Sequence, residues 1–198
     1  MRAAAGLLSV VLLAATARAD CDPPRRYCIA LAAYVPPGIS SSWFAAQVEE
    51  GNRRLAVVDA AVTVVATTPL PEVHRRIESR SARNRLLALG RQSPLRIIVV
   101  ERLADSEDPK ADRKGVTWRG GEDFLVVIDD DAHRWVLAHE LGHVLGLPHS
   151  TEHTSIMNKT TRLILPHQLV YTAREQPIMR RTLQRLFSTG KLSGGRAR

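Results

Sequence analysis

The stretch that most constrains this chain is HELGHVLGLPH, residues 139–149. His139 and His143 are four residues apart, so on a helix their rings lie on the same face, one turn apart. At that separation two imidazoles can bind the same zinc ion. Glu140 follows the first histidine and is placed to contact a metal-bound water without being a ligand. The pattern therefore predicts a zinc-binding helix with a carboxylate beside the metal.

The residues after this helix predict how a third ligand joins the site. Gly146 permits a positive φ at the helix C-terminus, and Pro148 hinders the helix from resuming. The chain can then turn back, so that His149 completes a three-histidine set and leaves a fourth position for water. A bare HExxH pattern is also compatible with an ordinary helix, but the longer pattern with its helix breaker favours zinc. Glu140 would serve as the general base toward a zinc-bound water.

The length and the N-terminus bound the domain organisation. The chain has 198 residues, enough for one domain with a core of its own. Residues 1–19 combine a basic start, an apolar run and the small-x-small sequence Ala17-Arg18-Ala19, which is typical of a cleaved signal peptide. The apolar run is too short for a permanent membrane span. We therefore expect a secreted protein, extracellular or periplasmic and without stable membrane insertion, with a catalytic domain over 20–190 and a disordered tail over 191–198.

The chain is basic, with a formal net charge of +8. Cleavage of the predicted signal peptide would remove Arg2 and Arg18 and lower the net charge to about +6. Arginines cluster over 75–96 and 174–185. These clusters are either solvated helix faces or a surface that attracts an acidic surface or polymer. No nucleic-acid-binding motif accompanies the charge, so a nucleic-acid partner is not expected. We expect a monomer.

Two smaller features each have two interpretations. Cys21 and Cys28 are the only cysteines, and in an oxidising compartment they are expected to form a short disulfide loop. The alternative is a thiolate that reaches the metal as an intrinsic inhibitor.

Asp129, Asp130 and Asp131 precede the zinc-binding helix, where acids usually cap a helix and complement its dipole. The alternative for them is calcium binding.

The order of apolar segments predicts the fold class. β-rich apolar stretches occur over 27–36, 60–69, 95–103 and 123–130. Helices are expected after Ser40 to Ser42, over the basic segment 71–89, at the zinc motif and from Pro166. The short stretch GVTW, residues 115–118, is a candidate edge strand. Alternating strands and helices predict an α/β fold: a twisted, mostly parallel mixed sheet with one antiparallel edge strand, packed on helices that include the zinc-binding helix.

The five-point pattern HExxHxxGxxH resembles the signature of the metzincin clan of zinc metallopeptidases. That clan also has a methionine-containing turn beneath the metal, and the sequence TSIMN, residues 154–158, supplies Met157 at a similar short spacing. Ser150 follows the third histidine, as in matrixins. The chain therefore resembles a matrixin-like metzincin of the bacterial type.

The resemblance implies a secreted zinc endopeptidase that binds one catalytic zinc ion and acts on protein or peptide substrates. It implies that Glu140 is the general base and that Met157 supports the site. It also implies that the edge strand, with Val116, Thr117 and Trp118, pairs with an extended peptide. The segment after Met157, including Leu163, would form a wall of the pocket just beyond the scissile bond.

Two other functions are compatible with the same pattern. The chain could be a non-proteolytic zinc-binding interaction module, although the intact Glu140 argues against this. It could also be a zinc hydrolase of a non-protein amide, which the spacing does not distinguish. Tyr171 is a candidate for approaching the oxyanion, whereas His133 and His153 are expected at the surface or behind the ligands.

Overall fold

The computed structural model describes residues 20–87, 89, 94–105, 108, 111–120, 123–159 and 165–194. The predicted signal peptide, residues 1–19, and the predicted pocket residue Leu163 lie outside the described residues. Within the described part of the chain, no helix combines the length and the apolar character that a membrane span requires.

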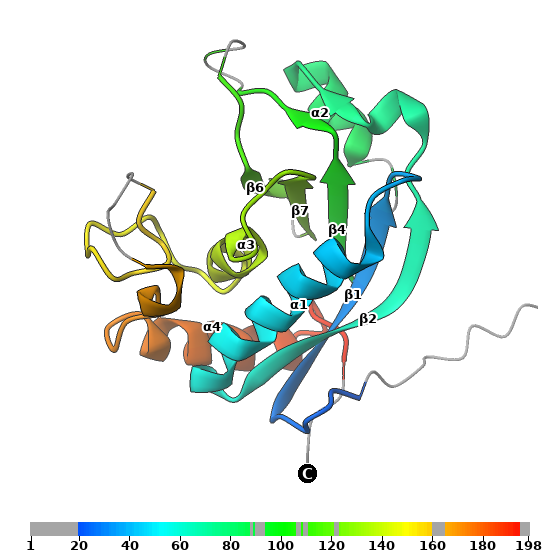
Figure 1. The fold of residues 1–198 in the computed structure, drawn as a ribbon. Coiled ribbons are helices and arrows are strands. Elements are labelled where there is room, and N and C mark those ends of the chain that lie inside the picture. The colour runs from blue at the N-terminus through cyan, green and yellow to red at the C-terminus, as the bar shows by residue number, and fades with distance from the viewer. Residues whose placement is uncertain are drawn as a thin grey trace, which may run out of the picture.

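A five-stranded sheet forms the centre of the fold (Figure 1). Its strands are β1 (Tyr27–Val35), β2 (Ala60–Pro69), β4 (Leu95–Val100), β6 (Gly115–Gly120) and β7 (Asp123–Asp129). The spatial order is β2-β1-β4-β7-β6. All neighbours are parallel except β6, which pairs antiparallel with β7 at the edge. This confirms the predicted α/β class and the predicted edge strand.

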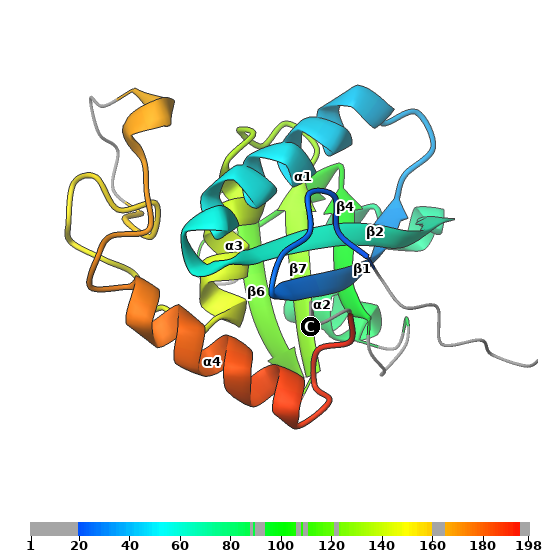
Figure 2. The same ribbon diagram turned by 90° about the horizontal axis from the view of Figure 1, so that it is seen from below.

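The central strands are apolar on both faces because helices cover both faces of the sheet. In β4, Ile97 belongs to the larger core and Ile98 to the smaller one. The larger core contains α1 (Ser41–Leu55), α3 (Val136–Val144) and α4 (Gln176–Ser188), and the smaller core contains α2 (Arg80–Leu86). Figure 2 shows α4 next to α3, with α1 crossing the same side of the sheet.

The basic segment 71–89 is not the continuous helix that the sequence predicted. It divides into a 3-10 turn η2 (Glu72–His74), a short strand β3 (Arg76–Ile77) and α2. β3 pairs in parallel with β5 (Arg102–Leu103), which buries Ile77. Ser79 is extended and its side chain accepts a hydrogen bond from the backbone of α2, so the helix starts only there.

The last helix also starts later than predicted. Pro166 opens only a 3-10 turn, η3 (Pro166–Gln168), and α4 begins at Gln176. Between them Val170 is extended, and its backbone exchanges hydrogen bonds with Thr154 and Ile156. These bonds hold the segment against the turn that contains Met157.

The chain after α4 remains packed beyond residue 190, where the sequence predicted a disordered tail. Leu192 is buried in the larger core, and the carbonyl of Ser193 accepts a hydrogen bond from the backbone of Ala30 in β1. The packed domain therefore extends to Gly194. Residues 195–198 lie outside the described residues.

Cys21 and Cys28 form a disulfide, as expected for the only two cysteines of a chain in an oxidising compartment. The bond lies against Ala30 and Ala61, on the first two strands. Because both sulfur atoms are bonded to each other, the alternative in which a thiolate inhibits the metal site is wrong.

The three acids before the zinc-binding helix do not cap it. α3 begins at Val136, and its N-cap residue makes no side-chain capping bond. Instead Asp129 and Asp131 bind the ammonium of Lys114, at 3.1 and 2.6 Å. These ion pairs tie the segment before β6 to the end of β7. Calcium binding by these acids gains no support, because among the described residues only three histidines form a convergent group of metal-ligand atoms.

Candidate metal centre

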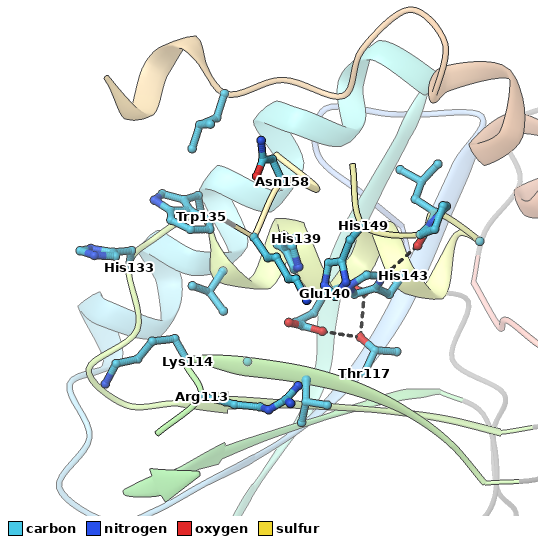
Figure 3. Close-up of a pocket in the computed structure, with 18 of the residues that line it drawn as sticks. Arg113, Lys114, Thr117, His133, Trp135, His139, Glu140, His143, His149 and Asn158 are labelled. Atoms are coloured by element: carbon cyan, nitrogen blue, oxygen red, sulfur yellow. Dashed lines mark hydrogen bonds between the residues drawn. The ribbon is translucent and has the colours of Figure 1, made fainter. Parts of the chain in front are cut away.

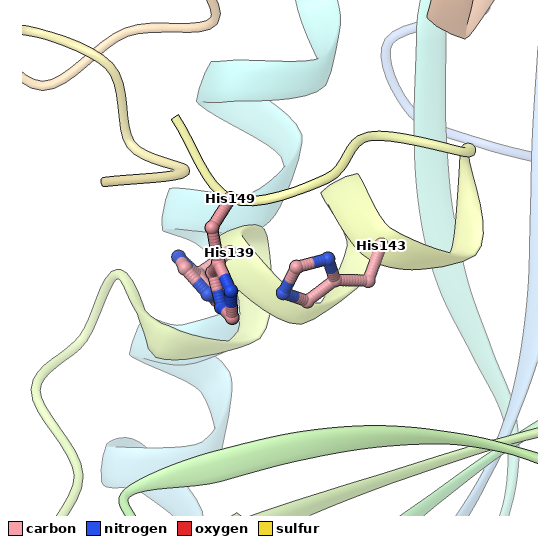
Figure 4. Close-up of side chains that lie close together, drawn as sticks. All are labelled: His139, His143 and His149. Carbon is pink, nitrogen blue, oxygen red and sulfur yellow. The ribbon is translucent and has the colours of Figure 1, made fainter. Parts of the chain in front are cut away.

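His139 and His143 lie on α3, which is buried almost all round. Leu137, Ala138, Leu141 and Val144 pack into the larger core and fix the rotation of the helix about its axis. The two histidines therefore face the same side, with ring centroids 4.9 Å apart (Figure 4).

The end of α3 is a Schellman turn that returns the chain to the histidines. Gly146 has a φ of +88°, which favours glycine, and its N–H donates to His143 O at 3.0 Å. The N–H of Leu147 donates to Gly142 O at 2.9 Å. The reversed chain then places the ring of His149 4.7 Å from that of His143. The predicted role of Gly146 is thus confirmed.

The three histidines converge with geometry and chemistry that fit a metal ion. One ring nitrogen of each lies within 4.8 Å of the others. The Nδ1 atoms of His139 and His143 lie 2.7 and 2.8 Å from the carbonyls of Ile156 and Leu147. An N–H at Nδ1 donates to each carbonyl, so Nε2 is the atom of each ring that would bind the ion.

The local environment also favours the neutral imidazoles that bind metals. Burial lowers the pKa of His143. Burial also lowers the pKa of His149, and the charges of His143, Lys159 and Arg113 act in the same direction. Three neutral nitrogen donors are a set that zinc prefers.

Glu140 is held beside the histidines by the edge strand (Figure 3). The hydroxyl of Thr117 on β6 lies 2.8 Å from Glu140 Oε2 and 2.9 Å from the Glu140 carbonyl. Burial raises the pKa of Glu140 to about 7, although the Thr117 hydrogen bond and the charge of Arg113 oppose the rise. Gly115 leaves room for this side chain, because a Cβ there would lie 2.7 Å from Oε1. A carboxylate of this kind can take up and release a proton near neutral pH.

Met157, the methionine of the predicted turn, packs against α3, the helix that carries His139 and His143. Its side chain is fully buried and packs against Gly142 so closely that a Cβ on the glycine would lie 2.3 Å from Met157 Sδ. Tyr171 packs on the same glycine, and its hydroxyl donates to the carbonyl of Ala138. Because Tyr171 is buried behind α3 and burial raises its pKa, the suggestion that it approaches the oxyanion is wrong.

Helix α1 supports the site from behind with three buried polar residues. Gln47 donates to the carbonyls of Ala132 and His133 and accepts from the N–H of Leu137, which fixes the start of α3. Arg54 forms an ion pair with Glu50 at 2.7 Å and donates to the carbonyl oxygen of Pro166 at 2.7 Å.

The roles of Gln47, Glu50 and Arg54 were not predicted from the sequence. These residues are spaced by three and four positions, so all three lie on the same face of a helix. That spacing is the sequence signal from which a shared buried role could have been predicted.

The histidines open into a cleft of about 1160 Å³ between β6, α3 and the segments around Asn158 and Pro166 (Figure 3). Of the predicted substrate-contacting residues, Val116 and Thr117 line this cleft. Trp118 does not; it packs in the smaller core on the other face, with Arg83 over its ring.

His133 and His153, which flank the motif, lie at the surface, as the sequence predicted. His133 is exposed at the rim of the cleft, stacked on Trp135, and His153 is exposed. Neither of them belongs to the convergent group.

Four cations that line the cleft were not singled out from the sequence: Arg113, Lys114, Arg119 and Lys159. They are separated along the chain and belong to no motif. Only the pairing of β6 with β7 and the turn after Met157 bring them to the same cleft.

The fold and the three-histidine site resemble those of metzincins. In agreement, the model of the family described as Matrixin matches residues 106–174, roughly a third of the chain that includes the edge strand, α3 and the methionine turn. A comparison with curated protein sequences found no match.

Two similar solved structures are metalloproteinase-II from Bacteroides fragilis and archaemetzincin from Methanopyrus kandleri. The first is 15% identical with a TM-score of 0.57, over 79% of this chain and 53% of the other. The second is 17% identical with a TM-score of 0.53, over 81% of this chain and 98% of the other. The chain thus spans about half the length of the Bacteroides protein. The family match and the site together support a zinc metallopeptidase.

Proposed function

We propose that this chain is a secreted zinc endopeptidase in which Glu140 acts as the general base. The observation that carries the proposal is the joint placement of a convergent three-histidine set and a buried carboxylate in an open cleft. His139, His143 and His149 would hold the ion. When bound, zinc supplies a Lewis acid that polarises a peptide carbonyl and acidifies water.

The two oxygen atoms of Glu140 have different roles in this proposal. Oε2 is held by the Thr117 hydroxyl at 2.8 Å, which fixes the plane of the carboxylate. Oε1 lies next to the space that Gly115 leaves open, and it is the atom that would accept a proton from the attacking water. The same oxygen would then release the proton to the leaving amine.

The edge strand would hold the substrate. β7 pairs with one side of β6, and the other side of β6 borders the cleft. A peptide that adds to this edge would be held extended by backbone hydrogen bonds, which depend little on its sequence. Arg54, through the Pro166 carbonyl, would fix the opposite wall of the cleft.

The test compares the native chain from Asp20 onward with its Glu140→Gln variant, measuring zinc content and cleavage of denatured protein or peptide libraries. We expect one zinc ion in both proteins and cleavage by the native chain alone, with a rate at least about 100-fold higher. His143→Ala should lose zinc as well as activity. If the native chain holds zinc and cleaves no peptide, the proposal fails, and the chain is a zinc-binding module or acts on a non-protein amide.

A further inference from the structure

We propose that the cleft selects peptides with acidic side chains on both sides of the scissile bond. This inference rests on the proposed function, because it names the substrate class of the same site. It is carried by the charges that line the cleft rather than by the metal ligands.

The lining of the cleft is rich in cations (Figure 3). Arg113, Lys114, Arg119 and Lys159 line it, whereas the only lining carboxylates among the described residues are Asp105 and Glu140. Bound zinc would add further positive charge. Low-dielectric walls focus such a field, so an acidic segment would be attracted and a basic one repelled.

The four cations differ in how far acids within the protein neutralise them. Arg113 pairs with Asp105 at 2.8 Å, and Lys114 is held by two aspartates. Arg119 stacks over the ring of Phe124, with no ion pair to any acid in the described part of the chain. Lys159 is exposed next to the methionine turn and likewise has no ion pair within the described ranges. Arg119 and Lys159 therefore carry most of the unpaired charge.

The positions of these cations match an extended peptide. Thr117 contacts Glu140 and so marks the reaction centre on β6. Arg119 is two residues after Thr117 on β6, so alternation along the strand places these two side chains on the same face. At about 3.3 Å per residue, Arg119 lies roughly 7 Å from Thr117 along the strand, whereas Arg113 precedes Thr117 in the chain and lines the cleft from the segment before β6.

The cations also approach the reaction centre itself. Arg113 lines the same cleft as His139, His143 and His149. Figure 3 shows Arg113 and Lys114 on the β6 side of the cleft, beneath Glu140. A substrate lying over the histidines would thus have cations on the side of β6, with Lys159 contributed by the turn after Met157.

The test uses two fluorogenic peptides that differ only in Glu or Gln at the positions two residues before and after the cleaved bond, which a peptide library first locates. For the native zinc-loaded chain we expect kcat/KM to be about tenfold higher for the Glu peptide at low salt. The preference should fall to about threefold or less at 0.5 M salt, because salt screens exposed charges. The Arg119→Gln/Lys159→Gln variant should reduce the low-salt preference to about twofold. Arg181→Gln, which removes an exposed arginine of α4 outside the cleft, should retain it.

Binding of the same peptides to zinc-loaded Glu140→Gln provides a second readout. Tighter binding of the Glu peptide by about tenfold supports the inference even if no peptide is cleaved, an outcome that would overturn the proposed function alone. Equal kcat/KM and equal affinity for the two peptides would overturn the inference and leave the proposed function standing. A preference that Arg181→Gln removes as strongly as the cleft variant would overturn it too.

Discussion

The carbonyl oxygen of Leu147 lies 2.8 Å from Nδ1 of His143, so the turn that ends α3 also orients a metal ligand. That carbonyl is held in place by the positive φ of Gly146 and by the Leu147 N–H, which closes the turn on Gly142. The end of the helix and the direction of the His143 ring are therefore determined together.

Gly146→Ala should weaken zinc binding as well as the fold. A φ of +88° costs an alanine about 1–2 kcal/mol, and its Cβ would lie 2.8 Å from Thr182 Oγ1. Because the turn would shift the Leu147 carbonyl, we expect zinc affinity to fall about tenfold in a chelator competition titration. Gly190→Ala is the matched control, since its φ is +69° but nothing lies within 4 Å. Gly190→Ala should lose stability without losing zinc, and equal zinc affinity in both variants would contradict this role of the turn.

Gly142→Ala should destabilise the protein although alanine is the better helix former. The added methyl would lie 2.3 Å from Met157 Sδ and 3.1 Å from Tyr171 Cε1, in a fully packed region. We expect a loss of about 1–3 kcal/mol in the free energy of unfolding, measured in urea. Gly51→Ala, where the nearest side-chain atom is at an ordinary 3.6 Å, should instead be neutral or stabilising. A stable Gly142→Ala protein would show that Met157 does not pack against the helix as described.

Thr117→Val should lower kcat while zinc content stays at the native level. The hydroxyl is the group that holds Glu140 Oε2, and valine keeps the shape but removes the hydrogen bond. The loss of one hydrogen bond to a charged group corresponds to about a tenfold change. Thr117→Ser keeps the hydroxyl and should retain most of the activity. If serine and valine lower kcat equally, the methyl group rather than the hydroxyl is what the site needs.

Glu50 should make stability depend on pH in the acidic range. Burial raises the pKa of Glu50, but the hydrogen bonds and charges of Arg53 and Arg54 outweigh this, so the net pKa is lowered from 4.5. A lowered pKa stabilises the fold fully above pH 4.5, and this contribution is lost as the pH falls through the folded-state value. Glu50→Gln should therefore cost about 3 kcal/mol near neutral pH, and the difference should shrink below pH 4.5.

Glu49, the exposed residue next to Glu50, provides the control for the pH dependence of stability. Glu49→Gln, one residue earlier on the solvent side of α1, should change stability little at any pH. A pH-independent difference between native chain and Glu50→Gln would show that packing, and not charge, explains the loss.

The metal site was predictable because its determinants are local. The three histidines, the carboxylate and the glycine at the helix end fall within 139–149, and helix periodicity with one breaker fixes their relation. The strands were predictable for a similar reason, since β-rich apolar runs such as 60–69 match β2 residue for residue.

The features that were missed depend on contacts between distant segments. Ile77 pairs with Leu103 across a two-residue ladder, and no periodicity within 71–89 reveals that pairing. Asp129 and Asp131 form ion pairs with Lys114 and do not cap α3. Lys114 lies beside them only because β6 pairs antiparallel with β7. The cationic lining of the cleft likewise requires the fold, not a motif.

The contrast between local and distant contacts has a consequence for the order in which the site is assembled during folding. All three metal ligands come from one short segment, whereas the Thr117–Glu140 contact spans 23 residues and the Arg54–Pro166 contact spans 112. Closing longer loops costs more entropy and slows their formation. The loops among the three ligands are therefore the shortest to close, while the proton acceptor and the cleft wall are aligned only when the rest of the domain has closed around them.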